Sequence, residues 1–244
     1  MPAILALETS SPVCSVALCA DGISDQIRAE AGREHHRLLL PMIDELLNRN
    51  GLKLADLDVV AYGEGPGSFT GLRIGAGVVQ GLAFASKLPV IGISSLQALA
   101  LAALEAHPDS HDPLIFVALD AHMNDVYCAV YQARAGSVDC VSEAKVVPAD
   151  NYAWFATLQS RPAIAAGDAW SRFTNLSAQL DEIVIPGPFY PDALNVAVLA
   201  QERSSGEWRD ASEAQPVYVR GTDQWKTIDQ QRAQAGPRSD TDAR

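Results

Sequence analysis

Short apolar runs alternate with longer segments of helical period along this chain, and their order predicts an α/β protein. Apolar runs predict strands over residues 3–7 and 13–19, and an Asp-Gly pair predicts a tight hairpin into a third strand over residues 23–30. Residues 34–51 have a helical period and end at Gly51, a residue type favoured just after a helix. The chain is therefore expected to open with three strands and a helix.

The second half of the chain repeats this order. The strand predicted over residues 114–119 is followed by Asp120, as the first strand is followed by Glu8, and two more strands are predicted before residue 148. A polar loop over residues 107–113 separates the two halves. Such a repeat predicts an internally duplicated structure.

Beyond the repeat, the pattern predicts a strand over residues 163–167 and three helices, over residues 152–158, 170–180 and 192–203. From about residue 222 the chain is polar and rich in Gln, Arg, Asp and Ser. A segment of this composition has too little apolar surface to bury, so the tail is expected to be disordered.

A glycine-rich turn over residues 62–77 connects a strand predicted over residues 58–62 to a helix predicted over residues 70–87. Ser68 or Thr70 can cap the first turn of this helix. A strand, a glycine turn and a helix in this order expose backbone N–H groups, which is typical of anion sites. The spacing matches neither the P-loop nor the dinucleotide fingerprint, so glycines that only turn the chain tightly are the competing interpretation.

Two predicted helices have more apolar surface than one face of a sheet covers. In residues 34–51 the apolar side chains span an arc of about 200°, and residues 70–87 are apolar around most of their circumference. Two pairs of glycines four residues apart in the second helix, Gly71 with Gly75 and Gly77 with Gly81, each leave a smooth patch that another helix can approach closely. The surplus predicts a protein partner. The alternative is a large internal core that buries both helices.

Charge and cysteine content restrict the class of protein. The formal net charge is −12, from 30 acidic and 18 basic residues, with no cluster of Lys and Arg, so we expect no strong direct binding of nucleic acid. The four cysteines lack a CxxC spacing, which favours a reducing compartment. The N-terminus lacks the features of a signal peptide, and no apolar run is long enough to span a membrane. We therefore expect a cytosolic protein.

The histidines form no convincing metal site. His35 and His36 are adjacent and point in different directions from a helix. His107 and His111 are four residues apart, but a proline and polar residues between them predict a loop, and no glutamate follows the first histidine as in HExxH. No metal ligand is therefore assigned.

Candidates for other chemistry are equally few. Ser68 does not stand in a GxSxG nucleophile elbow, and a helix cap is the favoured role for it. Glu8 and Asp120 end equivalent strands and would hold a magnesium ion if a nucleotide bound between the two halves. The alternative is that both are polar strand ends.

Taken together, these motifs resemble the TsaB family, also called YeaZ. The resemblance runs from residue 3 to about residue 226 and is carried by residues 5–10, 15–18, 65–75, 120–127 and 216–220. Its most specific part is a signature turn made of Gly65, Pro66, Gly67, Ser68, Phe69, Thr70, Gly71 and Arg73. The chain departs from the family pattern at Glu8, usually Asp, and at His122, often Arg, which weakens a metal or nucleotide role for the two strand ends.

The resemblance implies the duplicated α/β fold of the actin-like ATPase (ribonuclease H-like) superfamily, with two lobes of which the second is reduced. The N-terminal lobe would span residues 1–106 and carry the partner-binding helices. The reduced second lobe would span residues 114–221, and residues 222–244 would form the polar tail.

The resemblance also implies a function. Members of the family are bacterial, cytosolic, non-catalytic partners of TsaD, and with TsaE they form the assembly that transfers threonylcarbamoyl to the adenosine beside the tRNA anticodon. TsaC supplies the threonylcarbamoyl-adenylate and would contact the chain transiently at most. No cofactor is implied. A nucleotide at the partner contact and self-association of the free chain are left open.

In the family the contact with TsaD is made by the two helices of the N-terminal lobe, which correspond here to residues 35–50 and 70–87. The glycine turn is expected to direct the second of these helices, with its smooth glycine-lined surface, toward the partner. The expected contact residues are Leu38, Leu39, Met42, Ile43, Leu46, Gly71, Ile74, Gly75, Val78 and Leu82. The competing function is an ATP-dependent transferase or a metallopeptidase of the actin-like superfamily.

Overall fold

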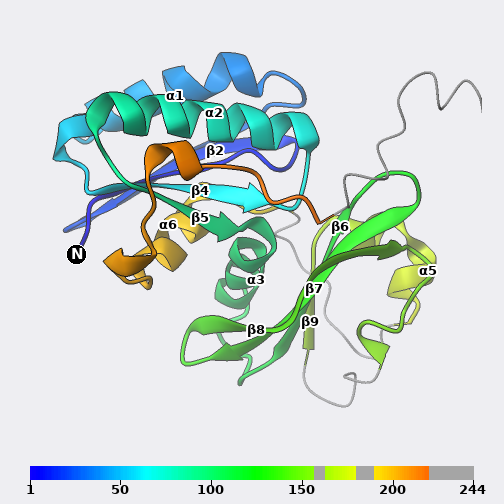
Figure 1. The fold of residues 1–244 in the computed structure, drawn as a ribbon. Helices are drawn as coiled ribbons and strands as arrows, with labels where there is room; N and C mark the ends of the chain where they lie inside the picture. Colours follow the sequence, from blue (N-terminus) through cyan, green and yellow to red (C-terminus); the bar gives the residue numbers. More distant parts are fainter. Residues whose placement is uncertain (157–162, 180–189, 220–244) are drawn as a thin grey trace, which may run out of the picture.

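The computed structural model describes residues 1–156, 163–179 and 190–219. Its elements stack in layers around two β-sheets (Figure 1). Helices α1 and α2 lie on the outer face of the first sheet, α3 and α6 lie between the sheets, and α4 and α5 lie on the far side of the second sheet. The predicted tail lies outside the described residues.

The first sheet has five strands in the order β3-β2-β1-β4-β5. Strands β1, β2 and β3 form the predicted antiparallel meander, and β4 and β5 continue it parallel to β1. Leu5 pairs with Leu18 and Val60 on one face, and its neighbour Ala6 pairs with Ala17 and Ala61 on the other, so the centre of the sheet is apolar on both faces. The strands are β1 (Ile4–Glu8), β2 (Val13–Ala20), β3 (Ile23–Glu30), β4 (Val59–Gly65) and β5 (Val90–Ser94).

The second sheet repeats the arrangement of the first. Its order, β8-β7-β6-β9, corresponds to β3-β2-β1-β4, with the same antiparallel pairs and the same parallel pair. Within the described ranges this sheet has no counterpart of β5. The duplication and the reduced second unit expected for the actin-like fold are thereby confirmed. The strands are β6 (Leu114–Asp120), β7 (Asp125–Arg134), β8 (Ser137–Pro148) and β9 (Ala163–Ala166).

Helices α1 (His35–Arg49) and α2 (Phe69–Ser86) cover the outer face of the first sheet. Helix α1 ends as predicted, because Gly51 takes a φ of +67° and the Leu52 N–H bonds the Leu47 carbonyl oxygen at 3.0 Å. The Oγ of Ser68 accepts a hydrogen bond from the Gly71 N–H at 3.2 Å. Ser68 is therefore the cap of α2, as predicted.

Helices α3 (Ser95–Glu105) and α6 (Ala193–Gln201) fill the space between the sheets with small and branched apolar side chains. Helix α6 packs on β1 and β2, and the Ala193 N–H donates to the Oγ of Ser15 at 2.9 Å. The chain thus returns to the first sheet before its end. The expected boundaries at residues 106 and 114–221 remain predictions, with α6 inside the second span contacting the first sheet.

One helix prediction in the second half is wrong, and another is tested only in part. Residues 152–156 form hydrogen-bonded turns within the helix predicted over 152–158, and residues 157–162 lie outside the described part. The helix predicted over 170–180 is two short ones, α4 (Ala169–Arg172) and α5 (Thr174–Ser177). Between them Phe173 leaves the helical region, with φ −109° and ψ 88°. The aromatic side chains of these segments cluster against β6, where the rings of Trp154 and Phe155 pack on Phe116 and the ring of Trp170 packs on both of them.

Three single-turn 3₁₀ helices complete the described elements: η1 (Leu54–Asp56), η3 (Ser205–Glu207) and η4 (Ala211–Glu213). Among the described residues, every helix is too short or too polar to cross a membrane.

Candidate functional site

The glycine-rich turn lies directly over the turn between β1 and β2. A cis peptide bond joins Gly65 to Pro66. The Ser68 N–H donates to the Ser10 carbonyl oxygen at 2.6 Å, and the Thr9 hydroxyl donates to the Gly71 carbonyl oxygen at 2.9 Å. Two segments about 60 residues apart in sequence are thereby fixed to each other.

The glycines of the turn are required by this internal contact. A Cβ on Gly67 would overlap the Ser10 carbonyl, and a Cβ on Gly71 or Gly75 would overlap backbone or hydroxyl oxygen of Thr9. The expectation that Gly71 and Gly75 face another protein is therefore corrected, since both are buried against the β1–β2 turn.

Two backbone N–H groups that would have to bind the anion in the competing interpretation are already hydrogen-bonded within the chain. The Ser68 N–H is bonded to Ser10, and the Gly71 N–H is bonded to the Ser68 hydroxyl. Backbone donors already bonded within the chain cannot also hold a phosphate without breaking these bonds.

Glu8 is enclosed beneath the turn. Its side chain is 0% exposed and accepts hydrogen bonds from the Ser10 N–H at 2.6 Å and from the Ser95 hydroxyl at 2.7 Å. Burial raises the pKa of Glu8, and these hydrogen bonds oppose the rise. The absent side chain of Gly63 leaves the space that the carboxylate occupies. Glu8 is thus bound inside the fold and does not face a ligand.

A cleft of about 530 Å³ lies between the two halves, lined by the glycine turn, the β1–β2 turn and the β6–β7 turn. Asp120 lies in its wall. Its carboxylate accepts the His122 N–H at 2.9 Å and lies 3.3 Å from the Nε of Arg172. The Asp120 N–H in turn donates to Asp168, whose pKa is raised by burial and further by the Asp120 charge. The second candidate metal ligand is therefore also engaged by the chain itself, and the described residues include no cluster of three or more metal-binding side chains.

The C-terminal part of the described chain, residues 214–219, forms a strap along α2 and the cleft. The Tyr62 hydroxyl accepts the Gln215 N–H at 3.0 Å and donates to the Gln215 carbonyl oxygen at 3.2 Å. The Gln80 side chain donates to the Ala214 carbonyl oxygen at 2.8 Å, and the Val217 N–H donates to the Glu64 carbonyl oxygen at 2.7 Å. This strap was missed as part of the site, although residues 216–220 belong to the motifs of the resemblance.

The signature turn contacts the strap through two aromatic residues, Phe69 of the turn and Tyr218 of the strap. The guanidinium of Arg73 lies 3.9 Å from the centre of the Phe69 ring, and its Nε donates to the Tyr218 hydroxyl at 2.9 Å. The rings of Phe69 and Tyr218 lie 5.4 Å apart. Phe69 and Arg73 therefore hold the C-terminal strap at the start of α2.

The structure divides the ten expected contact residues into two groups. Six are buried in the chain's own core: Leu39, Met42, Ile43, Leu46, Gly71 and Gly75. The other four are half-buried: Leu38, Ile74, Val78 and Leu82. For these four, a role in the partner contact stays a prediction.

Two large solvent-facing apolar residues of these helices are not among the ten expected contact residues. Phe84 on α2 is 82% exposed and Leu40 on α1 is 52% exposed. A Cβ placed on Gly77 or Gly81 would meet no described atom within 4 Å. We call the solvent-facing surface of these two helices the α1–α2 face, whose apolar residues are Leu40, Ile74, Gly77, Val78, Gly81, Leu82 and Phe84. Phe84 was detectable from its position about one helical turn beyond Gly81 and two turns beyond Gly77, on the same side of α2.

Comparisons with known proteins agree with this architecture. The family model described as "TsaD: tRNA N6-adenosine threonylcarbamoyltransferase" matches residues 26–179. The tRNA threonylcarbamoyladenosine biosynthesis protein TsaB of Haemophilus influenzae is 38% identical over 237 residues, which cover 92% of this chain and 96% of the relative. TsaB of Escherichia coli is 34% identical over 230 residues, with 92% and 97% covered.

Among solved structures, YeaZ from Pseudomonas aeruginosa superposes with a TM-score of 0.80 at 34% identity, covering 89% of this chain and all of that chain. Its likeness extends over both sheets, because almost the whole described chain takes part. Because relatives named TsaB match over nearly their whole length and the family model covers more than half of the chain, the chain belongs to the TsaB (YeaZ) family.

Proposed function

We propose that this chain serves the synthesis of threonylcarbamoyladenosine in tRNA as a non-catalytic subunit that binds a TsaD-type transferase, with TsaE joining the pair. The observation that carries the proposal is the exposed α1–α2 face, on which Phe84 and two open glycines of α2 lie toward solvent. The names of the relatives support the pathway, and the face supports the mode of action.

The α1–α2 face has the properties of a helix-docking surface. Burying an exposed phenylalanine side chain contributes about 1.5–3 kcal/mol to an association. The bare backbone at Gly77 and Gly81 lets a second helix approach closely, and Phe84 then lies where a pocket of the partner would take it. A complex formed in this way gains most of its affinity from apolar contact.

A supporting role without bond chemistry agrees with the state of the two acidic strand ends. The Glu8 carboxylate accepts hydrogen bonds from Ser10 and Ser95. The Asp120 carboxylate accepts a hydrogen bond from His122 and forms an ion pair with Arg172. With a net charge of −12, the chain is also poorly suited to hold tRNA by itself. In this proposal the transferase supplies both the catalytic groups and the grip on tRNA.

The test is Phe84→Asp, compared with Val141→Asp as a matched control. Both side chains are exposed, Phe84 at 82% and Val141 at 50%, but Val141 lies on β8 in the other sheet. Phe84→Asp should abolish co-purification with TsaD and remove threonylcarbamoyl transfer in an assay with TsaC, TsaD, TsaE and tRNA. Val141→Asp should leave both unchanged. Full activity of the Phe84→Asp protein, or equal activity in the absence of this chain, would overturn the proposal.

A further inference from the structure

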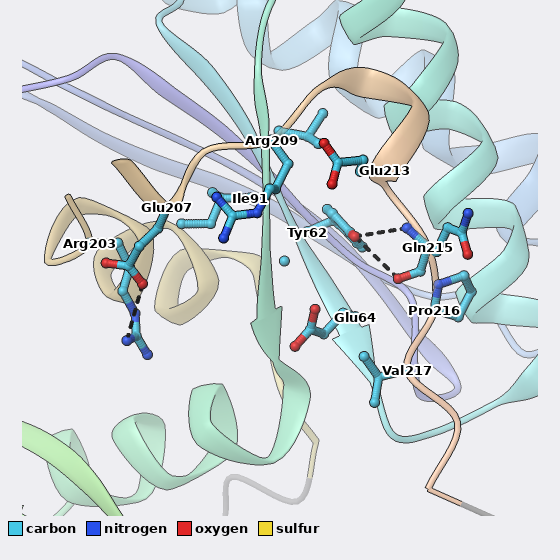
Figure 2. Close-up of a pocket in the computed structure, with 12 residues that line it drawn as sticks. Tyr62, Glu64, Ile91, Arg203, Glu207, Arg209, Glu213, Gln215, Pro216 and Val217 are labelled. Carbon is cyan, nitrogen blue, oxygen red and sulfur yellow. Dashed lines mark hydrogen bonds and ion pairs between the residues drawn. The ribbon is translucent and has the colours of Figure 1, made fainter. Parts of the chain in front are cut away.

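A second pocket lies on the other side of the strap from the α1–α2 face, at the β5 edge of the first sheet, and shares only Val217 with the lining of the cleft (Figure 2). Its volume is about 490 Å³. Strands β4 and β5 form its floor, the strap forms one wall, and the segment after α6 forms the other. Two backbone hydrogen bonds of 2.9 Å between Val90 and Arg209 hold this second wall to β5.

Glu64 is the central polar group of the pocket. Figure 2 shows its carboxylate pointing from β4 into the pocket, and Gly92 of β5 provides the space, because a Cβ on Gly92 would overlap this carboxylate. Among the described residues, no group donates a hydrogen bond to the carboxylate, although the backbone of Glu64 is bonded to the strap. Burial raises the pKa of Glu64, and the charge of Arg203 lowers it in part.

The other charged groups around the pocket leave an excess of negative charge. Arg203 lies 3.7 Å from Glu207, on the wall away from the strap. The Nη1 of Arg209 donates to the carbonyl oxygens of Gly206 and Trp208 at 3.1 and 3.3 Å. Glu213 adds a further carboxylate at the upper rim. Three carboxylates, those of Glu64, Glu207 and Glu213, therefore line the pocket against the two arginines, which leaves one negative charge in excess.

We infer that this pocket binds an organic cation, an alkylammonium or alkylguanidinium group, whose charge pairs with Glu64. A half-buried carboxylate without a donor is costly, and an entering cation offsets that cost with a charge-assisted hydrogen bond. The inference does not depend on the proposed contact with TsaD, because the pocket shares no residue with the α1–α2 face.

The lining favours an organic cation over a metal ion. The ring of Tyr62 and the side chains of Ile91 and Val217 give apolar walls against which an alkyl chain packs. Burial raises the pKa of Tyr62 to about 12, so its hydroxyl stays protonated and bonded to Gln215. A divalent metal ion would instead need several oxygen ligands, and the described residues bring no three acidic, histidine or cysteine side chains together.

The test measures binding of two probes to the full chain by NMR titration, with the amide signals of residues 62, 64 and 92 as reporters. Agmatine presents a free small cation. The peptide acetyl-Gly-Gly-Arg-Gly-Gly-amide presents the same guanidinium as a protein side chain. The wild-type chain should show saturable shifts at these amides. Glu64→Gln should raise the dissociation constant by about tenfold or more, equivalent to about 1.4 kcal/mol of lost binding free energy.

Glu45→Gln is the matched control, because it removes the same charge from an exposed position on α1. It should bind like the wild type, which separates the pocket from general attraction to an acidic protein. Gly92→Ala gives a second disruption, since its methyl group takes the space of the Glu64 carboxylate. Binding of agmatine alone identifies a free amine or guanidine as the ligand, and binding of the peptide identifies a side chain of another protein. Absence of saturable binding, or equal binding by Glu64→Gln, would overturn the inference.

Discussion

Arg73 of α2 donates a hydrogen bond of 2.9 Å to the hydroxyl oxygen of Tyr218, 145 residues later in the chain. The same guanidinium lies 3.9 Å from the centre of the Phe69 ring. The start of α2 and the strap are thus joined by one side chain, which suggests that the strap loosens first when this side chain is removed.

Arg73→Ala should therefore increase the opening of the strap. Loss of a partly exposed hydrogen bond and a cation–π contact costs about 1 kcal/mol in total. Hydrogen exchange of the Gln215 and Val217 amides should become about fivefold faster, equivalent to that free energy. Tyr218→Phe, which removes only the hydroxyl, should give a smaller effect in the same direction. Unchanged exchange at both amides would contradict the role assigned to Arg73.

The glycines of α2 should respond in opposite ways to alanine. Gly75→Ala places a methyl group against Thr9 and should destabilise the fold by about 1–3 kcal/mol. Gly77→Ala meets no described atom and should stabilise it by about 0.5–1 kcal/mol, because alanine has the higher helix propensity. Urea denaturation of the two variants gives both values.

The same pair separates folding from association. If a helix of TsaD packs on the bare backbone at Gly77, the stabilised Gly77→Ala chain should nevertheless bind TsaD more weakly. Wild-type affinity of this variant would show that the partner does not approach α2 closely at that point.

Glu8 should make the stability of the chain depend on pH. Because burial raises its pKa in the folded state above the ordinary value of 4.5, the unfolded chain ionises first as the pH rises. Its contribution to stability therefore falls from about pH 4.5 upward and levels off above the raised folded pKa. Glu8→Gln removes this dependence. The free energy of unfolding of the variant, minus that of the wild type, should therefore increase as the pH rises through this window.

Denaturation of both proteins over a pH series checks the difference, in which all other titrating groups cancel. Parallel curves for the variant and the wild type would show that Glu8 titrates alike in the folded and unfolded chains.

The strand order and the duplication were predictable because both depend on local signals that occur twice, such as the apolar runs that end in Glu8 and in Asp120. The contact between the start of α2 and the β1–β2 turn, which explains the glycines, could not be predicted. Gly71 and Thr9 are far apart in the chain, and glycine has no side chain to indicate its neighbour. The bond between Tyr62 and Gln215, 153 residues apart, likewise leaves no local pattern.

The direction of each helix face was the least predictable feature. Helix α2 is apolar around most of its circumference, so periodicity could not tell the side on the sheet from the side in solvent. The structure distinguishes them by burial, with Val79 at 0% and Phe84 at 82% exposure. The solvent-facing side of α2 is therefore not the side that the expected contact residues describe.

The neighbouring residues Leu39 and Leu40 test this distinction directly. Leu39 is 0% exposed in the core under α1, and Leu39→Ala should cost about 2–5 kcal/mol of stability, because it leaves a cavity. Leu40 is 52% exposed, and Leu40→Ala should change stability by only about 0.5 kcal/mol. In a pull-down with TsaD at a temperature where both variants are folded, Leu40→Ala should reduce binding and Leu39→Ala should not. The reverse result would return the contact to the buried residues, which would then have to open to meet the partner.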